Sequence, residues 1–246
     1  MRALVLSGGG SKGAYQVGVL RYLTEQGLSW DIVCGVSVGA LNGSFISQYE
    51  KDFQRQGAMH LEMLWKTIKG NRSIYRTHTL GQLGRILEGG LFSAKPLRDM
   101  IYDNLDRTNI LASGVKLHVG AISCTTGEYR SVDEMNENLH DWIVASSAFP
   151  VAFPPVKIDG DTWTDGGIGK YSPLSDVLPY IDEITEIDFI ATEPIESIIS
   201  IPEHIKVNIY CPKEPLGIKP LSFDAKKIEE LMILGWDQAH SQFVVI

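Results

Sequence analysis

The sequence predicts a three-layer α/β fold, in which a central, mostly parallel sheet carries helices on both faces and a helical insertion. Strand-like and helix-like segments alternate from the first residues, an order typical of parallel strands joined by helices. The 246 residues are 44% hydrophobic, which is enough to bury a sizeable core. No repeat or linker interrupts the chain, so we expect residues 1–246 to form one domain.

Two pairs of strand and helix begin the fold. We expect a strand over residues 3–6, a helix over 11–26, a second strand over 31–36 and a helix over 38–49. The first helix is apolar on most sides, so it should be buried. Residues 52–109 then show helical segments interrupted by glycines, which we interpret as a helical insertion or cap.

The remaining elements complete the sheet and cover it. In chain order we expect strands over 115–123 and 127–132, a helix over 136–148, a hairpin over 156–167, a helix over 173–180, strands over 187–192 and 204–210, and an amphipathic helix over 224–242. Asp159 and Gly160 supply the tight turn of the hairpin.

Composition excludes several classes of protein. The formal net charge of −8 argues against nucleic acid as a partner and against purely electrostatic adhesion to anionic lipid. Cys34, Cys124 and Cys211 lack metal-ligand spacing and lie in apolar contexts, so we expect buried free thiols in a reducing compartment. Met1 runs directly into the first strand, and no apolar run is long enough to span a membrane. We therefore expect a cytoplasmic protein, and the sequence predicts no particular oligomeric state.

A glycine-rich turn follows the first strand. Gly8, Gly10 and Gly13 form the pattern GxGxxG between a strand and a helix, which is the setting of a dinucleotide-binding loop. Such a loop is completed by an acidic residue at the end of the second strand, but that position holds Val36 and Ser37. A nucleotide-binding α/β module that uses this loop is therefore the weaker of the alternatives.

A second glycine pattern surrounds a serine at the end of the second strand. Gly35, Ser37 and Gly39 form GxSxG, the pattern of a sharp strand-to-helix turn that exposes a nucleophilic serine hydroxyl. The helix that follows would point its N-terminus at developing negative charge. Ser37 is thus the candidate nucleophile.

A serine hydroxyl needs a base that takes its proton. None of the six histidines lies in a small-residue loop just after a strand, which argues against a Ser-Asp-His triad without removing that alternative. Asp165 is the other candidate, because Gly166 and Gly167 would leave its carboxylate free to reach a partner, although Asp-Gly-Gly also forms ordinary turns. An aspartate of ordinary pKa is a weak base, so Asp165 needs a water-poor pocket and direct contact with Ser37.

The glycine-rich turn has a second interpretation. The backbone N–H groups of Gly8, Gly9 and Gly10, next to a helix N-terminus, suit an oxyanion as well as a phosphate. The first two strands should lie close together in the sheet, so this turn and the serine turn would open onto the same edge. A nucleophile and an anion hole at one edge make an acyl-transfer site.

Four blocks of the sequence, taken in order, resemble the patatin-like phospholipases, which are serine acyl hydrolases with a Ser-Asp dyad. The blocks are GGGSKGAYQVGVL, GVSVGALNG, ASSAFPVAFPPV and DGGIGKYSP, and they place the catalytic domain within residues 2–192. The resemblance implies that Ser37 attacks an ester carbonyl and that Asp165 is the general base. It also implies that the amides of Gly8, Gly9 and Gly10 hold the oxyanion, and that no metal or organic cofactor is needed.

Two positions depart from the family's pattern. Lys12 stands where the glycine loop usually has arginine, which keeps the charge but loses the bidentate geometry. Lys170 and Tyr171 precede Pro173, where the family usually carries asparagine. Both departures concern the substrate side of the pocket. If these changes prevent productive substrate binding, the protein would be a non-catalytic lipid-binding scaffold, which is the main alternative to an enzyme.

The resulting prediction is a lipid acyl hydrolase of the phospholipase A or esterase type, with a lipid or acyl-ester substrate and peripheral contact with membranes. The residues that we place on the substrate side are Lys12, Phe149, Phe153 and Pro154. Residues 65–78 combine basic and aromatic side chains, and they could form either a membrane-facing lip or an ordinary solvated helix end.

Overall fold

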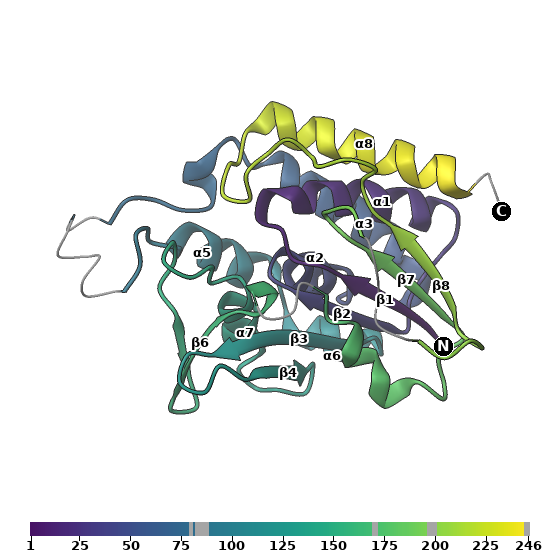
Figure 1. Cartoon of the computed structure of the whole chain (residues 1–246), viewed down its shortest axis with the longest axis horizontal. Helices are drawn as coiled ribbons and strands as arrows, with labels where there is room; N and C mark the ends of the chain where they lie inside the picture. Colours follow the sequence, from purple (N-terminus) through teal and green to yellow (C-terminus); the bar gives the residue numbers. More distant parts are fainter. Residues whose placement is uncertain (79–80, 82–88, 169–171, 196–200, 244–246) are drawn as a thin grey trace.

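The structure, a computed structural model, describes residues 1–78, 81, 89–168, 172–195 and 201–243. Within these residues an eight-stranded sheet has the order β5-β6-β3-β2-β1-β7-β8, with β4 paired to β3 (Figure 1). The strands are β1 (Arg2–Leu6), β2 (Ile32–Val36), β3 (Lys116–Ser123), β4 (Tyr129–Asp133), β5 (Val156–Ile158), β6 (Asp161–Asp165), β7 (Glu186–Ile190) and β8 (Lys206–Tyr210).

The sheet is parallel over most of its width. Neighbouring strands from β3 through β2, β1 and β7 to β8 all run in one direction. Two strands, β4 and β6, pair antiparallel with β3, and β5 pairs antiparallel with β6. The prediction of an α/β fold with a mostly parallel sheet is therefore confirmed.

The first two strands are direct neighbours and lead into helices at the same edge of the sheet. The chain passes from β1 into η1 (Gly10–Lys12) and α1 (Gly13–Glu25), and from β2 into α2 (Val38–Ile46). Leu6 at the end of β1 is in register with Gly35 near the end of β2. The glycine-rich turn and the serine turn therefore open side by side. In Figure 1 this edge faces away from the N-terminus, where β1 begins.

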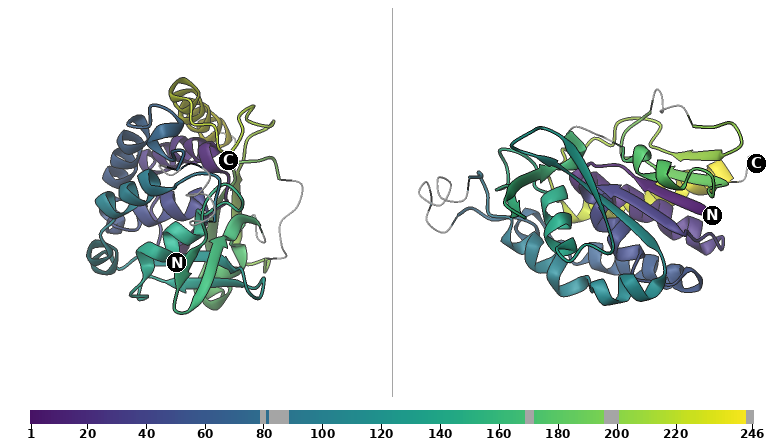
Figure 2. Two further views of the ribbon diagram at one scale, coloured as in Figure 1. Left: turned by 90° about the vertical axis from the view of Figure 1, so that its left-hand side faces the viewer. Right: turned by 90° about the horizontal axis from the view of Figure 1, so that it is seen from below.

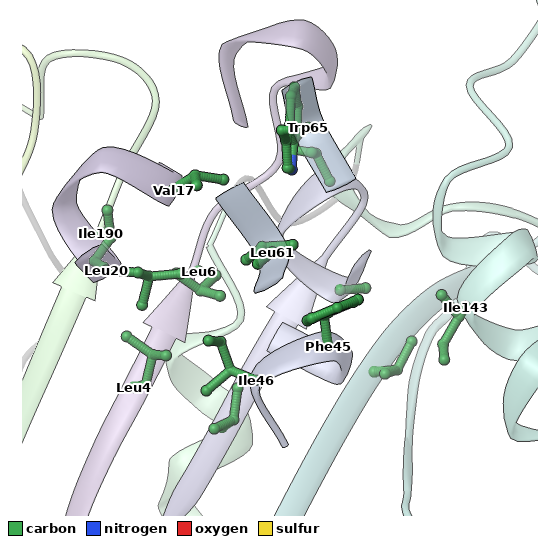
Figure 3. Close-up of a cluster of buried hydrophobic side chains, with 14 of the residues drawn as sticks. Leu4, Leu6, Val17, Leu20, Phe45, Ile46, Leu61, Trp65, Ile143 and Ile190 are labelled. Atoms are coloured by element: carbon green, nitrogen blue, oxygen red, sulfur yellow. The ribbon is translucent and has the colours of Figure 1, made fainter. Parts of the chain in front are cut away.

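The α-helices gather on one face of the sheet, which holds the larger hydrophobic core (Figure 2, left). The helices downstream of α2 are α3 (Gln54–Lys66), α5 (Lys95–Asn104), α6 (Arg107–Ser113), α7 (Leu139–Ser146) and α8 (Ala225–Phe243), with short 3-10 turns η2 (Lys51–Phe53) and η3 (Asn71–Ser73). Figure 3 shows Leu6 of β1 meeting side chains of α1, α2 and α3, among them Leu20, Ile46 and Leu61.

The opposite face of the sheet has a smaller core. Ala3 and Val5, which alternate with the residues facing the helices, pack here with Leu174 and Val177. These two belong to η5 (Leu174–Tyr180), so in the described residues this face is covered by a 3-10 segment and not by an α-helix.

Helix α8 lies along α1 with the two backbones in close approach. A Cβ atom on Gly18 would meet the carbonyl oxygen of Met232, and one on Gly235 would meet that of Tyr15. Because neither glycine has a side chain, α8 can cover α1, and the expected burial of the first helix is confirmed. The stretch 52–109, which we interpreted as an insertion, contributes α3, η3, α5 and α6 to the helical face.

The cysteines are all free, but they differ in burial. Cys34 on β2 is buried and Cys211 is half-buried. The expectation of burial is wrong for Cys124, which is exposed because it lies in the turn between β3 and β4. Of the helices in the described ranges, none combines the length and the apolar character needed to cross a membrane.

Candidate active site

Ser37 sits on a strained turn between β2 and α2. Its backbone has φ 54° and ψ −129°, a conformation that residues other than glycine rarely adopt. A Cβ atom on Gly35 would collide with the carbonyl of Gly39, and one on Gly39 would collide with the carbonyl of Leu6. The glycines on either side of the serine are therefore required by the tightness of the turn, which is the geometry that GxSxG predicts.

Asp165 makes direct contact with this serine. The Ser37 hydroxyl donates a hydrogen bond of 2.7 Å to Oδ2 of Asp165, whose side chain approaches from the end of β6. The other carboxylate oxygen, Oδ1, accepts a 2.7 Å hydrogen bond from the backbone N–H of Gly167. Asp165 is only 3% exposed. The two groups are 128 positions apart in the sequence, and the pairing of β6 with β3 brings them together.

Burial raises the pKa of the Asp165 carboxyl to about 6, against an ordinary value of 3.8, although the hydrogen bonds from Ser37 and Gly167 act in the opposite direction. Withdrawal from water is thus the largest influence on this group. At neutral pH the carboxylate is ionised, and it is a stronger base than an exposed aspartate.

Two serines at the end of α7 hold the backbone of Ser37. The N–H of Ser37 donates a 2.9 Å hydrogen bond to the hydroxyl of Ser146. That hydroxyl donates a 2.6 Å hydrogen bond to the carbonyl of Gly120 on β3. The hydroxyl of Ser147 donates 3.3 Å to the carbonyl of Ser37. The sequence alone does not reveal the role of these serines, although both lie in the block ASSAFPVAFPPV.

Replacing Ser146 with alanine should destabilise the protein by about 1–3 kcal/mol, because it leaves the buried N–H of Ser37 and carbonyl of Gly120 without their shared partner. Turnover should also fall, since the strained turn loses its anchor. Urea unfolding and kcat together measure both effects.

Ser44→Ala is the matched control for this variant. Ser44 is also fully buried, and in the described part of the chain its hydroxyl has no hydrogen-bond partner. Its removal should change stability little. Equal effects of the two substitutions would show that the Ser146 hydroxyl does not support Ser37.

The glycine-rich turn lies against Ser37. A Cβ atom on Gly8 would lie 3.3 Å from Cβ of Ser37. The carbonyl of Gly8 is held by the hydroxyls of Ser7 and Thr192. Among the described residues, no group accepts a hydrogen bond from the N–H of Gly8, Gly9 or Gly10. Three backbone donors are therefore available next to the serine.

Positive φ angles of 145° at Gly9 and 58° at Gly10 shape this turn. A side chain at either position would also strike a neighbour, Thr192 at Gly9 and the carbonyl of Pro220 at Gly10. The conformation that leaves the N–H groups unused therefore depends on glycine.

A cavity of about 410 Å³ opens beside Ser37 and extends between α2, α3 and α5. Its walls are mostly apolar. Side chains that line it include Val38, Leu41, Phe45, Leu61, Leu64, Trp65, Ile68, Ile74, Leu97, Met100 and Ile101. No histidine is among its described lining residues. The stretch 52–109 thus supplies the wall of the cavity opposite α2.

Most of the residues that we placed on the substrate side lie at this cavity. Phe149 and Phe153 line it, and so does Lys12, whose ammonium group forms an ion pair with Glu193, another lining residue. Pro154 is not among the described lining residues. The sequence alone does not reveal this partner, because Glu193 follows β7 and lies 181 positions from Lys12.

The other sequence expectations have mixed outcomes. Lys170 and Tyr171 lie outside the described residues. In the segment 65–78, Trp65 and Ile74 line the cavity, whereas the lysines and arginines are exposed.

Comparisons with known proteins identify the family of the chain. The family model for patatin-like phospholipase matches residues 4–178. Patatin-like phospholipase domain-containing protein 7 from Rattus norvegicus is 41% identical over 71 residues, 27% of this chain and 5% of that protein. Lysophospholipase NTE1 from Saccharomyces cerevisiae is 23% identical over 184 residues, 71% of this chain and 10% of that protein. The chain thus spans a tenth or less of the length of these relatives.

A solved structure shares the fold. VipD from Legionella pneumophila aligns with a TM-score of 0.51 and 14% sequence identity, and the alignment covers 98% of this chain and 66% of that one. At this level of identity the likeness concerns the arrangement of sheet and helices alone.

Proposed function

This chain belongs to the patatin-like phospholipase family, and from that premise we propose that it hydrolyses carboxylic ester bonds of lipids through an acyl intermediate on Ser37. The observation that carries the proposal is the 2.7 Å hydrogen bond from the Ser37 hydroxyl to Asp165, made at the head of an apolar cavity. A nucleophile in contact with a buried base is the arrangement that covalent acyl transfer needs.

The proposed reaction has two halves. In the first, Oγ of Ser37 attacks the ester carbonyl carbon while Oδ2 of Asp165 takes the hydroxyl proton. The carbonyl oxygen becomes an oxyanion, which the N–H groups of Gly8, Gly9 and Gly10 can bind, since no group in the described part of the chain accepts from them. Asp165 then gives its proton to the departing alcohol, and the acyl group stays on Ser37.

In the second half, water replaces the alcohol. Asp165 takes a proton from the water as its oxygen attacks the acyl carbon, and the oxyanion forms again at the glycine turn. When the bond to Ser37 breaks, the fatty acid leaves and the proton returns to the serine hydroxyl. The dyad therefore ends each cycle in its starting state.

The cavity supports a lipid as the substrate. Its apolar walls suit an acyl chain, and the Lys12–Glu193 ion pair is a polar group available to a head group. The relative from Saccharomyces cerevisiae is named a lysophospholipase. We propose phospholipids and lysophospholipids as the substrate class.

We further propose that the described elements form a single domain, with residues 52–109 as its insertion. The free thiols favour a reducing, cytoplasmic environment.

The raised pKa of Asp165 predicts the pH dependence of the reaction. The base must be ionised, so kcat/KM for a soluble short-chain ester should rise with pH and level off above a pKa of about 6. Well below that pKa it should fall about tenfold per pH unit, as expected for a single ionisation. Initial rates measured between about pH 5 and 9 test this.

Two results would contradict this assignment. Activity that stays level down to pH 5 would mean that the base has the pKa of an ordinary aspartate. An inflection near neutral pH that disappears when one histidine is replaced would instead indicate a histidine triad.

A further inference from the structure

Four exposed apolar residues belong to segments that border the cavity. They are Leu91, Phe149, Val151 and Ile168, with exposed fractions of 41%, 43%, 73% and 53%, and we call them the mouth patch. Phe149 and Ile168 also line the cavity. Leu91 joins the group because its N–H donates a 2.9 Å hydrogen bond to the carbonyl of Val151. Single exposed apolar residues are ordinary, but a cluster around a cavity opening indicates an interaction surface.

Val151 has a backbone conformation that valine rarely adopts, and its side chain is exposed. Its φ is 67°, a marked outlier for a β-branched residue. Backbone hydrogen bonds hold the chain before and after Val151. The N–H of Phe92 donates to the carbonyl of Ala152, and the N–H of Phe153 donates to the carbonyl of Phe149, both at 2.9 Å. Phe153 is buried while Val151 points to solvent. A strained apolar residue kept exposed in this way suggests a function for its exposure.

Three basic residues lie in segments next to the same cavity. Arg72, Arg76 and Lys219 are exposed, and in the described residues no carboxylate lies within ion-pair distance of any of them. Arg76 pairs through its backbone with Ser93, two residues after Leu91. Lys219 precedes Pro220, which lines the cavity. We call these three residues the basic rim.

Further contacts join the basic rim to the cavity. The hydroxyl of Tyr75, next to Arg76, donates 2.7 Å to the carbonyl of Leu221, and Leu221 lines the cavity. The side-chain amide oxygen of Asn71, next to Arg72, accepts 2.7 Å from the N–H of Phe223, another lining residue. The segment that carries Arg72 and Arg76 is therefore held against the wall of the cavity. In a chain with a net charge of −8, these three cations, which have no ion-pair partner among the described residues, are complementary to phosphate groups.

We propose that the mouth patch and the basic rim dock the protein on a lipid surface. The mouth patch enters the outer part of the lipid layer and the basic rim contacts lipid phosphates, so that the cavity opens directly onto the lipid. Because the chain is acidic, its overall charge does not attract it to anionic lipid, so insertion of the apolar side chains must provide much of the binding free energy. The inference rests on the proposed function, since the cavity must take lipid for this orientation to matter.

The test separates docking from catalysis. Ser37→Ala protein is mixed with vesicles of phosphatidylcholine and phosphatidylglycerol, and bound protein is measured by co-sedimentation. Adding Leu91→Ser and Val151→Asn should weaken binding by at least about tenfold, because two apolar anchors are lost. Asparagine tolerates positive φ, so the Val151 substitution should not unfold the loop.

Two controls make the result specific. Ile233→Asn on α8 removes a side chain that is 57% exposed but lies away from the cavity, and it should leave vesicle binding unchanged. With Ser37 intact, the Leu91→Ser and Val151→Asn protein should hydrolyse a soluble short-chain ester at the parental rate. Failure of the hydrolase proposal would appear in the ester assay, and failure of the docking proposal in the sedimentation assay.

The basic rim gives a second readout. Arg72→Gln with Arg76→Gln should weaken binding to anionic vesicles and reduce its salt dependence, with little effect on vesicles of phosphatidylcholine alone.

Three outcomes would overturn the proposal. One is that Ser37→Ala protein does not bind vesicles. Another is that the mouth-patch variant binds them as well as the Ile233→Asn control. The third is a dimer in solution that the mouth-patch substitutions convert to monomer, because the patch would then cover a second copy of the chain.

Discussion

Replacing Ser37 with alanine should lower kcat/KM for a soluble acyl ester by at least about 10⁴-fold, because no other group in the proposed reaction can carry the acyl intermediate. The substitution removes one hydroxyl and keeps the strained backbone at φ 54°. The protein should therefore stay folded, and thermal unfolding followed by circular dichroism checks this. Steady-state rates on a chromogenic ester measure the loss.

A second substitution distinguishes loss of the hydroxyl group from misfolding of the turn. Glycine adopts the conformation at position 37 without strain, so Ser37→Gly should be at least as well folded as Ser37→Ala and equally inactive. Substitutions of the individual histidines should leave activity largely intact, since none lines the described part of the cavity. Wild-type turnover by a folded Ser37→Ala protein would refute the covalent mechanism.

Asp165→Asn should have the second large effect, a loss of about 10³-fold in kcat/KM. Asparagine has nearly the same shape. Its amide oxygen can accept the hydrogen bond from Gly167 while its NH2 group donates to the Ser37 oxygen, but it cannot take a proton. The variant should therefore keep the geometry of the site and lose its base. Comparison of kcat/KM with the wild type at pH 8 gives the size of the effect.

The same substitution should raise stability at alkaline pH. The pKa of Asp165 is raised to about 6 from an ordinary 3.8, so the folded state binds this proton more tightly than the unfolded state does. In the wild type, stability is thus lost as pH rises from about 4 through 6, by a total of about 3 kcal/mol. Asparagine has no such ionisation, so the variant should be the more stable protein at pH 8 and nearly equal at pH 4.

Urea unfolding at the two pH values measures this difference, and Asp159→Asn is the matched control. Asp159 is an exposed carboxylate on the same hairpin, at a φ of 51° that asparagine adopts readily. Its replacement should give no comparable pH-dependent gain. An Asp165→Asn protein that is less stable than wild type at pH 8 would mean that the carboxylate contributes more through its hydrogen bonds than it loses by burial.

Local sequence patterns predicted the fold and the candidate dyad because their signals lie within a few residues. The alternation of strands and helices predicted the parallel sheet. The pattern GxSxG predicted a tight turn at Ser37, which requires glycine two positions before and two positions after the serine. Asp165 became a candidate because no histidine has the loop context expected of a base and because two glycines follow it, and the family resemblance implied its role as the base. These are short-range features that a single sequence carries.

The sequence did not reveal the residues that hold the site residues in place, because these contacts join segments far apart in the chain. Ser146 is 109 positions from Ser37, and Glu193 is 181 positions from Lys12. No periodicity links such pairs, and a serine at a helix end has many ordinary explanations. The exposure of Cys124 was missed for a related reason, because an apolar sequence context does not reveal that the residue falls in a turn.

The most direct test of the central claim is covalent labelling with a fluorophosphonate, a reagent that phosphonylates activated serines. Intact-protein mass should increase by one adduct, peptide mapping should place it on Ser37, and labelling should be strongly slowed in Asp165→Asn. A non-catalytic lipid-binding scaffold predicts no adduct at Ser37. Absence of labelling at Ser37, or labelling that does not depend on Asp165, would contradict the dyad.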